Sequence, residues 1–222
     1  MKKILIYEDE GVSANSLQRL FGVCMELMPH YSIQRATHRT FFIHGWEDST
    51  SLLIFPGGRD LAYHHKLKGE GNARIRSFVH RGGRFLGVCA GGYYGASEVE
   101  FEKGGKLEVC GQRELAFFPG KAIGPAYGPG LFRYENDQGA RPASIQWEKG
   151  NSLIYFNGGC YFHEAEKFSS TSILARYNDL PDSPAACVFC DFGQGAALLS
   201  GIHPEYAPKD PFMYYILNKI LT

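Results

Sequence analysis

Short apolar runs and helical apolar stripes alternate along the first part of the chain. Continuous apolar runs, typical of buried strands, occur at residues 3–7, 52–55 and 84–88. Between them, apolar side chains recur at intervals of three and four residues, which is the spacing of one helical face. One stripe follows a capping Ser13 and comprises Leu17, Leu20, Phe21, Cys24, Leu27 and Met28; the other follows a capping Asn72 and comprises Ile75, Phe78 and Val79, before Gly82 and Gly83. Another helix is predicted from residue 90 to about residue 99.

The middle of the chain has a different composition. Glycine and proline dominate residues 104–139, but this segment also holds the aromatic residues Phe117, Phe118, Tyr127, Phe132 and Tyr134. Disordered segments are poor in aromatic residues. We therefore predict short strands and ordered loops that pack on the main sheet, and not a disordered linker.

The last part of the chain returns to apolar runs, at residues 144–147, 153–156, 173–177, 186–189 and 196–200. Asp210 and Pro211 begin a final helix, whose inner face is formed by Phe212, Met213, Ile216, Leu217, Ile220 and Leu221. Alternating strands and helices imply right-handed crossovers and a mostly parallel sheet covered on both faces. We predict one three-layer α/β/α domain over residues 1–222, with flavodoxin-like strand order.

Composition narrows the class of partner. Lysine plus arginine and aspartate plus glutamate both number 23, so the formal net charge is zero. A nucleic acid or an acidic membrane usually requires a basic surplus, and we expect neither as a partner. The apolar runs are shorter than the roughly 18–20 residues that cross a bilayer. The six cysteines, without a leader-like segment, suggest free thiols in a cytoplasmic protein.

The clearest chemical motif surrounds Cys89. A buried strand runs through Gly87 into Cys89, and Gly91 follows where a helix is predicted to begin. This pattern is typical of a nucleophile elbow, in which a tight turn presents a reactive side chain at the carboxyl edge of the sheet. Bulky residues in place of the glycines would clash with such a turn. We predict that Cys89 is a nucleophile; a small buried core cysteine is the alternative.

A second motif, His203-Pro204-Glu205, follows the last predicted strand. Proline favours an extended tripeptide, in which side chains two residues apart point the same way. His203 would then accept and return the proton of Cys89, and Glu205 would orient the ring. A surface loop histidine is the alternative.

A third motif, Pro56-Gly57-Gly58-Arg59, ends another buried strand at the same predicted edge. Main-chain amides of Gly57 or Gly58, with that of Ala90, would form an oxyanion hole. Arg59 and Tyr63 would then line the rim of the cleft and contact a substrate.

The three motifs, in this order, resemble the class I glutamine amidotransferase superfamily. Residues 87–95 (GVCAGGYYG) and 155–159 (YFNGG) are similar to the N-terminal domain of biotin protein ligases and its stand-alone bacterial relatives. The resemblance covers nearly the whole chain and implies a Cys89–His203–Glu205 triad with oxyanion donors at Gly58 and Ala90. Tyr93 stands where glutamine-hydrolysing members carry a glutamine. This departure argues against glutamine as the substrate.

The resemblance implies a hydrolase or amidotransferase that acts on a C–N bond of a small-molecule amide or peptide-like substrate. It implies no cofactor, no metal and no biotin ligase activity, and a protein partner is left open. One alternative is a non-catalytic module that binds a ligand or a protein through the cysteine elbow. Another is a redox or glyoxalase-like role, with Glu8 near the cysteine.

Other cysteines and histidines are assigned less specific roles. Cys187 and Cys190 lie three residues apart in an apolar strand, so they should point to opposite faces as core residues. Cys160 and His163 follow the 155–159 motif and are candidates for binding near the cleft. His64-His65 is predicted to lie in a solvated loop.

Overall fold

The computed structural model describes residues 2–134 and 136–222. Met1, in the predicted domain, and Glu135, in the glycine- and proline-rich segment, lie outside the described residues. The helices are α1 (Ala14–Leu27), α2 (Asp60–Leu67), α3 (Glu70–His80), α4 (Ala90–Gly95) and α5 (Pro211–Leu221). The strands are β1 (Lys3–Tyr7), β2 (Ser32–Ala36), β3 (Thr50–Phe55), β4 (Arg84–Val88), β5 (Ala96–Phe101), β6 (Val109–Gln112), β7 (Phe118–Gly124), β8 (Arg141–Trp147), β9 (Gly150–Phe156), β10 (Tyr161–Phe162), β11 (Thr171–Tyr177), β12 (Ala185–Phe192) and β13 (Gly195–Ser200).

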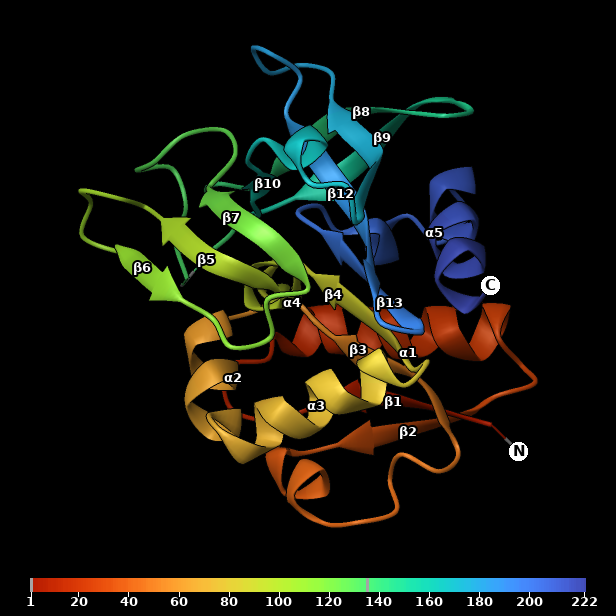
Figure 1. Cartoon of the computed structure of the whole chain (residues 1–222). Coiled ribbons are helices and arrows are strands. Elements are labelled where there is room, and N and C mark those ends of the chain that lie inside the picture. The colour runs from red at the N-terminus through yellow and green to blue at the C-terminus, as the bar shows by residue number, and fades with distance from the viewer. Residues whose placement is uncertain (1, 135) are drawn as a thin grey trace.

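A parallel sheet forms the half of the molecule that contains the N-terminus (Figure 1). Its strand order is β2-β1-β3-β4-β13, and each of these neighbours pairs in parallel. The order matches the flavodoxin-like arrangement, in which the chain reverses its direction of winding beside the first strand. From β13 onward the sheet continues through antiparallel pairs with β12 and β10, and the β8–β9 hairpin joins it through β11. The predicted α/β class is confirmed.

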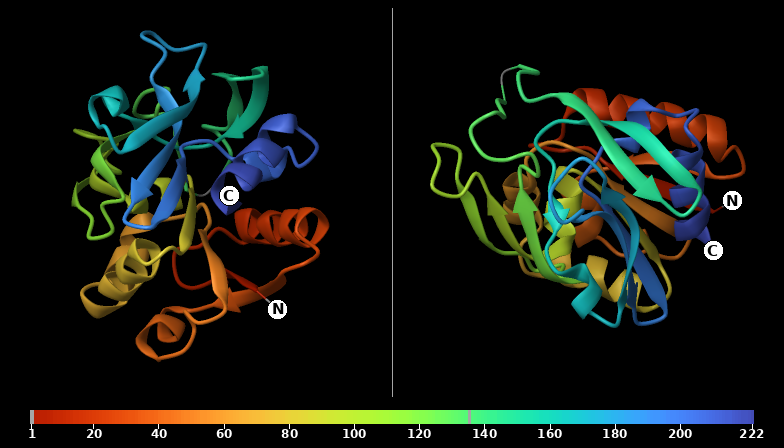
Figure 2. Two further views of the ribbon diagram at one scale, coloured as in Figure 1. Left: turned by 45° about the vertical axis from the view of Figure 1, so that its right-hand side comes forward. Right: turned by 90° about the horizontal axis from the view of Figure 1, so that it is seen from above.

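Helices cover both faces of the parallel strands (Figure 2). Alternate side chains of each strand enter different core clusters, as the period of two in a strand requires. Leu53 and Phe55 pack with α2 and α3, whereas Leu52 and Ile54 pack with α1 and α5. Strands buried on both faces explain why their sequences are continuously apolar.

Local signals predict most helix starts correctly but fail at Asn72. Ser13 caps α1 and Asp210 caps α5, as expected. Asn72 lies inside α3, because its side chain bonds to Glu114 and Tyr94 and Gly69 takes the capping position.

Two further corrections concern element boundaries. The helix predicted over residues 90–99 ends at Gly95, because the next residues pair with β7 as strand β5. The predicted loop at His64-His65 is helix α2, held to the core by buried Tyr63 and Leu67.

The glycine- and proline-rich segment is ordered, as predicted, in its described residues. It contains β6 and β7, which pair with the two edges of β5. Residues 125–134 then form a loop in which Phe132 packs edge-to-face against Phe101 and Tyr134. This loop lies near the carboxyl edge of the parallel strands and contributes to the cavity described below.

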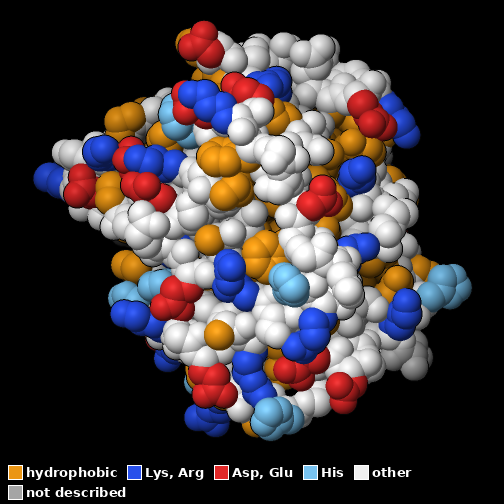
Figure 3. All heavy atoms as spheres, in the orientation of Figure 1, with side chains coloured by type: hydrophobic (Ala, Val, Ile, Leu, Met, Phe, Trp, Pro, Cys, Tyr) orange, Lys and Arg blue, Asp and Glu red, His pale blue; other side chains and the backbone are white. Residues whose placement is uncertain are grey.

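The surface carries positive and negative side chains in an interspersed pattern on the face shown in Figure 3. Among the residues that the structure describes, no helix is long and apolar enough to cross a membrane. The interspersed surface charges agree with the balanced charge of the sequence.

Close main-chain contact holds the two segments that deliver the site residues. A Cβ atom added at Gly159 would lie 1.6 Å from the carbonyl oxygen of Gly201. In return, a Cβ atom at Gly201 would lie 1.9 Å from the carbonyl oxygen of Cys160. Only glycine lets the two backbones approach so closely.

We therefore expect Gly159→Ala to lower the free energy of unfolding by at least ~2 kcal/mol, because main-chain atoms must move apart. Gly22→Ala is the matched control, since its Cβ would meet nothing within 4 Å on the exposed side of helix α1. It should raise stability by ~0.5–1 kcal/mol. Urea denaturation of both variants is the measurement, and equal stabilities would contradict the steric explanation.

Candidate active site

Cys89 occupies a strained turn between β4 and α4. Its backbone has φ 52° and ψ −101°, a combination that non-glycine residues rarely adopt and that is often found at functional sites. Its N–H donates to the carbonyl oxygen of Ser200 at 2.7 Å, which fixes the turn to β13. A Cβ atom at Gly87 or Gly91 would lie 2.2 Å or 2.1 Å from a carbonyl oxygen, so both glycines are sterically required.

His203 follows β13 and meets Glu205 through a turn, not through the extended tripeptide that we predicted. Pro204–Tyr206 forms a 3₁₀ helix, and this turn folds the carboxylate back toward the ring. His203 Nδ1 and Glu205 Oε1 are 2.8 Å apart. Tertiary contacts hold both ends of this turn: His203 N–H donates to the carbonyl oxygen of Tyr155 at 2.9 Å, and the Glu205 carboxylate accepts from the Ser16 hydroxyl at 2.7 Å.

The charges around His203 favour its protonated form. Burial alone lowers the pKa of this ring, but Glu205 and Cys89, by their charge and hydrogen bonds, raise the pKa of His203 to about 10. Because Nδ1 is used by Glu205, Nε2 is the nitrogen left for the sulfur of Cys89. His203 and Glu205 are therefore brought together, Cys89 and His203 line the same cavity, and all three side chains are buried.

Ser16 is a member of the site that the sequence analysis missed. Its hydroxyl donates to Glu205 Oε1 at 2.7 Å and accepts the N–H of Gly57 at 3.0 Å. A polar residue one helical turn before apolar Leu20, on the inner face of α1, was the available signal. That signal does not identify a partner, because Glu205 lies 189 residues further along the chain.

In the Pro-Gly-Gly loop, both the N–H and the carbonyl oxygen of Gly57 are hydrogen-bonded. Gly57 donates its N–H to Ser16, and its carbonyl oxygen accepts from Ser13 N–H at 2.8 Å and Tyr63 O–H at 3.1 Å. The next N–H, that of Gly58, points opposite to this carbonyl because the peptide is trans. Gly58 itself lines the cavity.

Two predicted binding roles are corrected by this loop. The N–H of Gly57 already bonds to Ser16, so it does not serve as an oxyanion donor. Tyr63 is fully buried behind the loop and does not contact the cavity, because its hydroxyl bonds to the carbonyls of Pro56 and Gly57.

A cavity of about 830 Å³ opens at the carboxyl edge of the sheet. Of the predicted residues, Gly58, Arg59, Cys89, Ala90, Tyr93 and His203 line it. Its walls are rich in aromatic rings, namely Tyr93, Phe101, Phe132, Tyr134, Tyr155 and Tyr206. The guanidinium group of Arg59 lies over the ring of Tyr134, 4.5 Å from its centroid. The size is in the range that binds drug-sized ligands.

Tyr93 lines the cavity, and its hydroxyl also makes a hydrogen bond within the protein. Its hydroxyl donates to the carbonyl oxygen of Gly158 at 3.0 Å and thereby fixes the loop after β9. The neighbouring carbonyl, that of Asn157, lies 3.8 Å from the sulfur of Cys89. Tyr93 therefore supports the loop whose backbone faces the candidate nucleophile.

Asp60 is a charged cavity residue that was not predicted. Its carboxylate accepts from Arg113 Nε at 2.7 Å, and both side chains are almost completely buried. Burial raises the pKa of Asp60, whereas the charge and hydrogen bond of Arg113 oppose that rise. The cavity thus has one buried carboxylate in its wall in addition to the Glu205 pair.

The remaining candidates lie away from this cavity. His163 is half-exposed, and Cys160 is enclosed so that burial raises the pKa of its thiol well above the usual range. Cys187 and Cys190 belong to different core clusters, as predicted. Glu8 pairs with Arg35 at the surface and does not line the cavity, which argues against the glyoxalase-like alternative.

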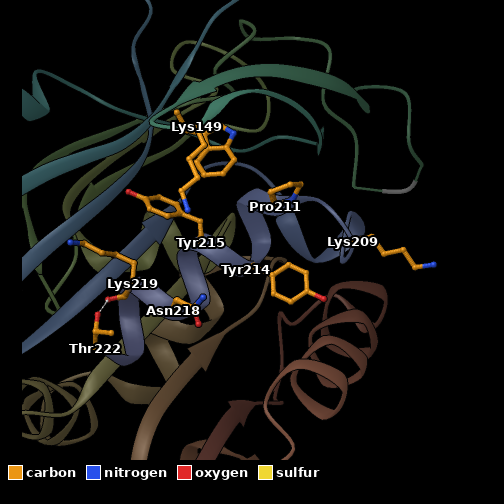
Figure 4. A pocket seen from close by; sticks show the side chains of 9 residues that line it. Lys149, Lys209, Pro211, Tyr214, Tyr215, Asn218, Lys219 and Thr222 are labelled. Atoms are coloured by element: carbon orange, nitrogen blue, oxygen red, sulfur yellow. Dashed lines mark hydrogen bonds between the residues drawn. The ribbon is translucent and has the colours of Figure 1, made fainter.

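A second hollow of about 480 Å³ lies along α5 (Figure 4). It is lined mainly by lysine and aromatic side chains and contains none of the predicted site residues. Within residues 2–134 and 136–222, no group of three histidine, cysteine, aspartate or glutamate side chains is arranged to hold a metal ion.

Comparison with known proteins gives a family and a fold. The family model for the N-terminal part of biotin-protein ligase matches residues 2–214. An uncharacterized protein of Chlamydia muridarum (strain MoPn / Nigg) is 43% identical, over 94% of this chain and 82% of its own length. A biotin–protein ligase of Schizosaccharomyces pombe is 39% identical over 93% of this chain, which spans only 34% of that enzyme.

A similar solved structure is that of a putative GMP synthase component from Thermoplasma acidophilum. It has a TM-score of 0.55 and 12% identity, over 99% of this chain and 98% of its own. At this level of identity the likeness shows the fold alone.

The raised pKa of His203 predicts how stability depends on pH. Because the folded pKa of about 10 lies above the ordinary 6.5, protonated His203 stabilises the fold. This contribution is complete below pH 6.5 and is lost as the pH rises through 10. Between about pH 7 and 10, the free energy of unfolding should fall more steeply for the natural chain than for His203→Gln.

Urea denaturation at several pH values measures this slope. His163→Gln is the matched control, because that ring is half-exposed and its one nearby carboxylate is 3.9 Å away. It should retain the natural slope. Parallel curves for the natural chain and His203→Gln would show that the ring carries no stabilised proton.

Proposed function

This chain belongs to the family of biotin-protein ligase N-terminal domains, and from that premise we propose that it is a thiol-dependent hydrolase of C–N bonds. The observation that carries the proposal is the buried His203–Glu205 pair beside a large cavity that both Cys89 and His203 line. A cysteine on a strained turn, next to a histidine held by a carboxylate, is the arrangement that activates a thiol nucleophile. The likeness of fold to the GMP synthase component supports an amidotransferase-like architecture.

The first proposed step forms a thioester. The sulfur of Cys89, its proton transferred to His203, attacks the substrate carbonyl carbon. The carbonyl oxygen becomes negative and accepts from Gly58 N–H and from Ala90 N–H, which begins α4 and has no acceptor inside the helix. His203 then gives its proton to the leaving nitrogen as the C–N bond breaks, and an amine or ammonia departs.

The second proposed step uses water. His203 takes a proton from water, the hydroxide attacks the thioester carbon, and the C–S bond breaks as His203 returns the proton to the sulfur of Cys89. The products are a carboxylic acid and the restored Cys89 thiol. Glu205 orients the ring throughout and stabilises its positive charge.

The proposed substrate is a small-molecule or peptide-like amide larger than glutamine. Tyr93 replaces the residue that holds glutamine in related hydrolases, and its hydroxyl is already bonded to Gly158. The aromatic walls and the 830 Å³ volume favour a bulky, partly apolar acyl group. Biotin transfer is not carried over, since the chain matches only 34% of the Schizosaccharomyces pombe enzyme.

A cytoplasmic location accompanies this proposal. All six cysteines, in the described part of the chain, are free and five are buried. Free thiols persist in reducing compartments, and the proposed chemistry requires a free thiol at Cys89.

A ligand-binding module without catalysis is the second candidate. The observation in its favour is the same cavity, which is large and aromatic whether or not Cys89 reacts. The two functions differ in what Cys89→Ser does: it abolishes turnover in a hydrolase but leaves a binding module able to bind.

We expect a screen of small amides to give turnover that falls at least ~10³-fold in Cys89→Ser and in His203→Ala. Cys110→Ser is the matched control, because Cys110 is an exposed cysteine outside the cavity. It should retain full activity. A substrate whose turnover is unaffected by Cys89→Ser would contradict the thiol mechanism.

Alkylation of Cys89 provides a test that needs no substrate. In a Cys110→Ser background, iodoacetamide should modify Cys89 at about pH 7 roughly tenfold faster than in the same chain with His203→Ala, since a protonated neighbour favours the thiolate. Mass spectrometry of the modified peptide measures the rate. Equal rates would remove His203 from the proposed role.

A further inference from the structure

Ser16 joins two parts of the site that lie far apart in the sequence. Its hydroxyl accepts the N–H of Gly57 at 3.0 Å and donates to Glu205 Oε1 at 2.7 Å. The same carboxylate oxygen is 2.8 Å from His203 Nδ1. One buried hydroxyl therefore links the Pro-Gly-Gly loop to the candidate triad.

The direction of each hydrogen bond is settled by chemistry. An N–H only donates, so the Ser16 oxygen accepts from Gly57 and its own proton is free for the carboxylate. Ser16 is 1% exposed and Glu205 is 1% exposed, so water cannot replace either bond without a change in packing. Both bonds therefore constrain the atoms that they join.

The hydrogen bonds of Gly57 determine the orientation of the Gly58 amide. With its N–H on Ser16 and its carbonyl oxygen on Ser13 N–H and Tyr63 O–H, both adjoining peptide planes are fixed. The second plane carries the N–H of Gly58, a residue that lines the cavity. Loss of the Ser16 bond leaves the first plane held from its carbonyl side alone, where Pro56 accepts from Gly91 N–H at 3.2 Å and from Tyr63 O–H at 3.3 Å.

The carboxylate end of the link acts on the triad. Oε2 of Glu205 is buried without a hydrogen-bond partner among the described residues, so Oε1 carries both of its bonds. Loss of the Ser16 donor leaves His203 as the one remaining partner of the carboxylate. The His203–Glu205 pair then loses its hydrogen bond to Ser16 of helix α1.

We propose that Ser16 is a positioning residue that couples the oxyanion amide of Gly58 to the His203–Glu205 pair. It touches neither Cys89 nor the cavity, and acts by fixing both groups in one geometry. The inference rests on the proposed hydrolase function for its kinetic part. Its effect on the reactivity of Cys89 is independent of any substrate.

Ser152→Ala is a matched control for Ser16→Ala. The Ser152 hydroxyl also accepts from a nitrogen, Trp147 Nε1 at 3.2 Å, and donates to a carboxylate, Asp210 Oδ1 at 2.9 Å. Ser152 is buried and lies outside the cavity. A purely structural role for Ser16 predicts that both variants lower the urea midpoint and leave the kinetics nearly unchanged.

We expect Ser16→Ala to lower kcat by ~10–100-fold with KM within ~3-fold, because the oxyanion bond is made chiefly in the transition state. Its alkylation rate at Cys89 should fall toward that of His203→Ala, and the pH dependence of that rate should flatten. Ser152→Ala should keep kcat and the alkylation rate within ~2-fold of the natural chain.

Two results would overturn the proposal. One is a Ser16→Ala protein that matches Ser152→Ala in both kcat and alkylation; the other is a change in KM alone, with kcat and alkylation unchanged. If the natural chain turns over no amide, the hydrolase proposal fails by itself. In that case the alkylation comparison alone decides the role of Ser16, and equal rates in the two variants reject it.

Discussion

The geometry of the site depends on close contact between main-chain segments at the carboxyl edge of the sheet. Gly91 lies against the carbonyl of Phe55, Gly87 against that of Gly91, and Gly159 against that of Gly201, at distances that admit no Cβ atom. These contacts join β3, β4, β9 and β13 without intervening side chains. Protein interiors transmit strain because they are close-packed, so the strained backbone of Cys89 is held by its neighbours and does not relax.

The carboxylate of Glu205 is buried at this close-packed edge of the sheet. Glu205 is withdrawn from water, and its charge is offset by protonated His203 and by the Ser16 hydroxyl. A buried ion pair usually adds little net stability, because desolvation opposes the attraction between the charges. The protonated ring stabilises the fold relative to the neutral ring, but desolvation reduces the net gain from the pair, and buried titratable pairs beside a cavity are common at functional sites. The same reasoning applies to Asp60 and Arg113 in the cavity wall.

Sequence periodicity predicts the buried strands and the long helices, and it fails where tertiary contacts decide the outcome. Strand β2 escapes prediction because its sequence is largely polar and, at the edge of the sheet, Ala36 is its one buried residue. Helix α2 has few apolar residues, so its sequence resembles that of a loop. These residues are buried because α4 and the Pro-Gly-Gly loop lie beside the helix. Residues 96–99 form a strand because β7 offers a pairing partner.

The sequence by itself determined the α/β class, the elbow at Cys89 and the candidate identities of His203 and Glu205, because each depends on neighbours along the chain. Only the tertiary structure decided that His203 and Glu205 meet beside a cavity that Cys89 also lines, that Glu205 arrives through a 3₁₀ turn, and that Gly57 N–H is bonded to Ser16 while Gly58 lines the cavity. Ser16 shows the reason most clearly. Its partner lies 189 residues away, and a hydrogen bond between such positions exists only once the fold has brought them together.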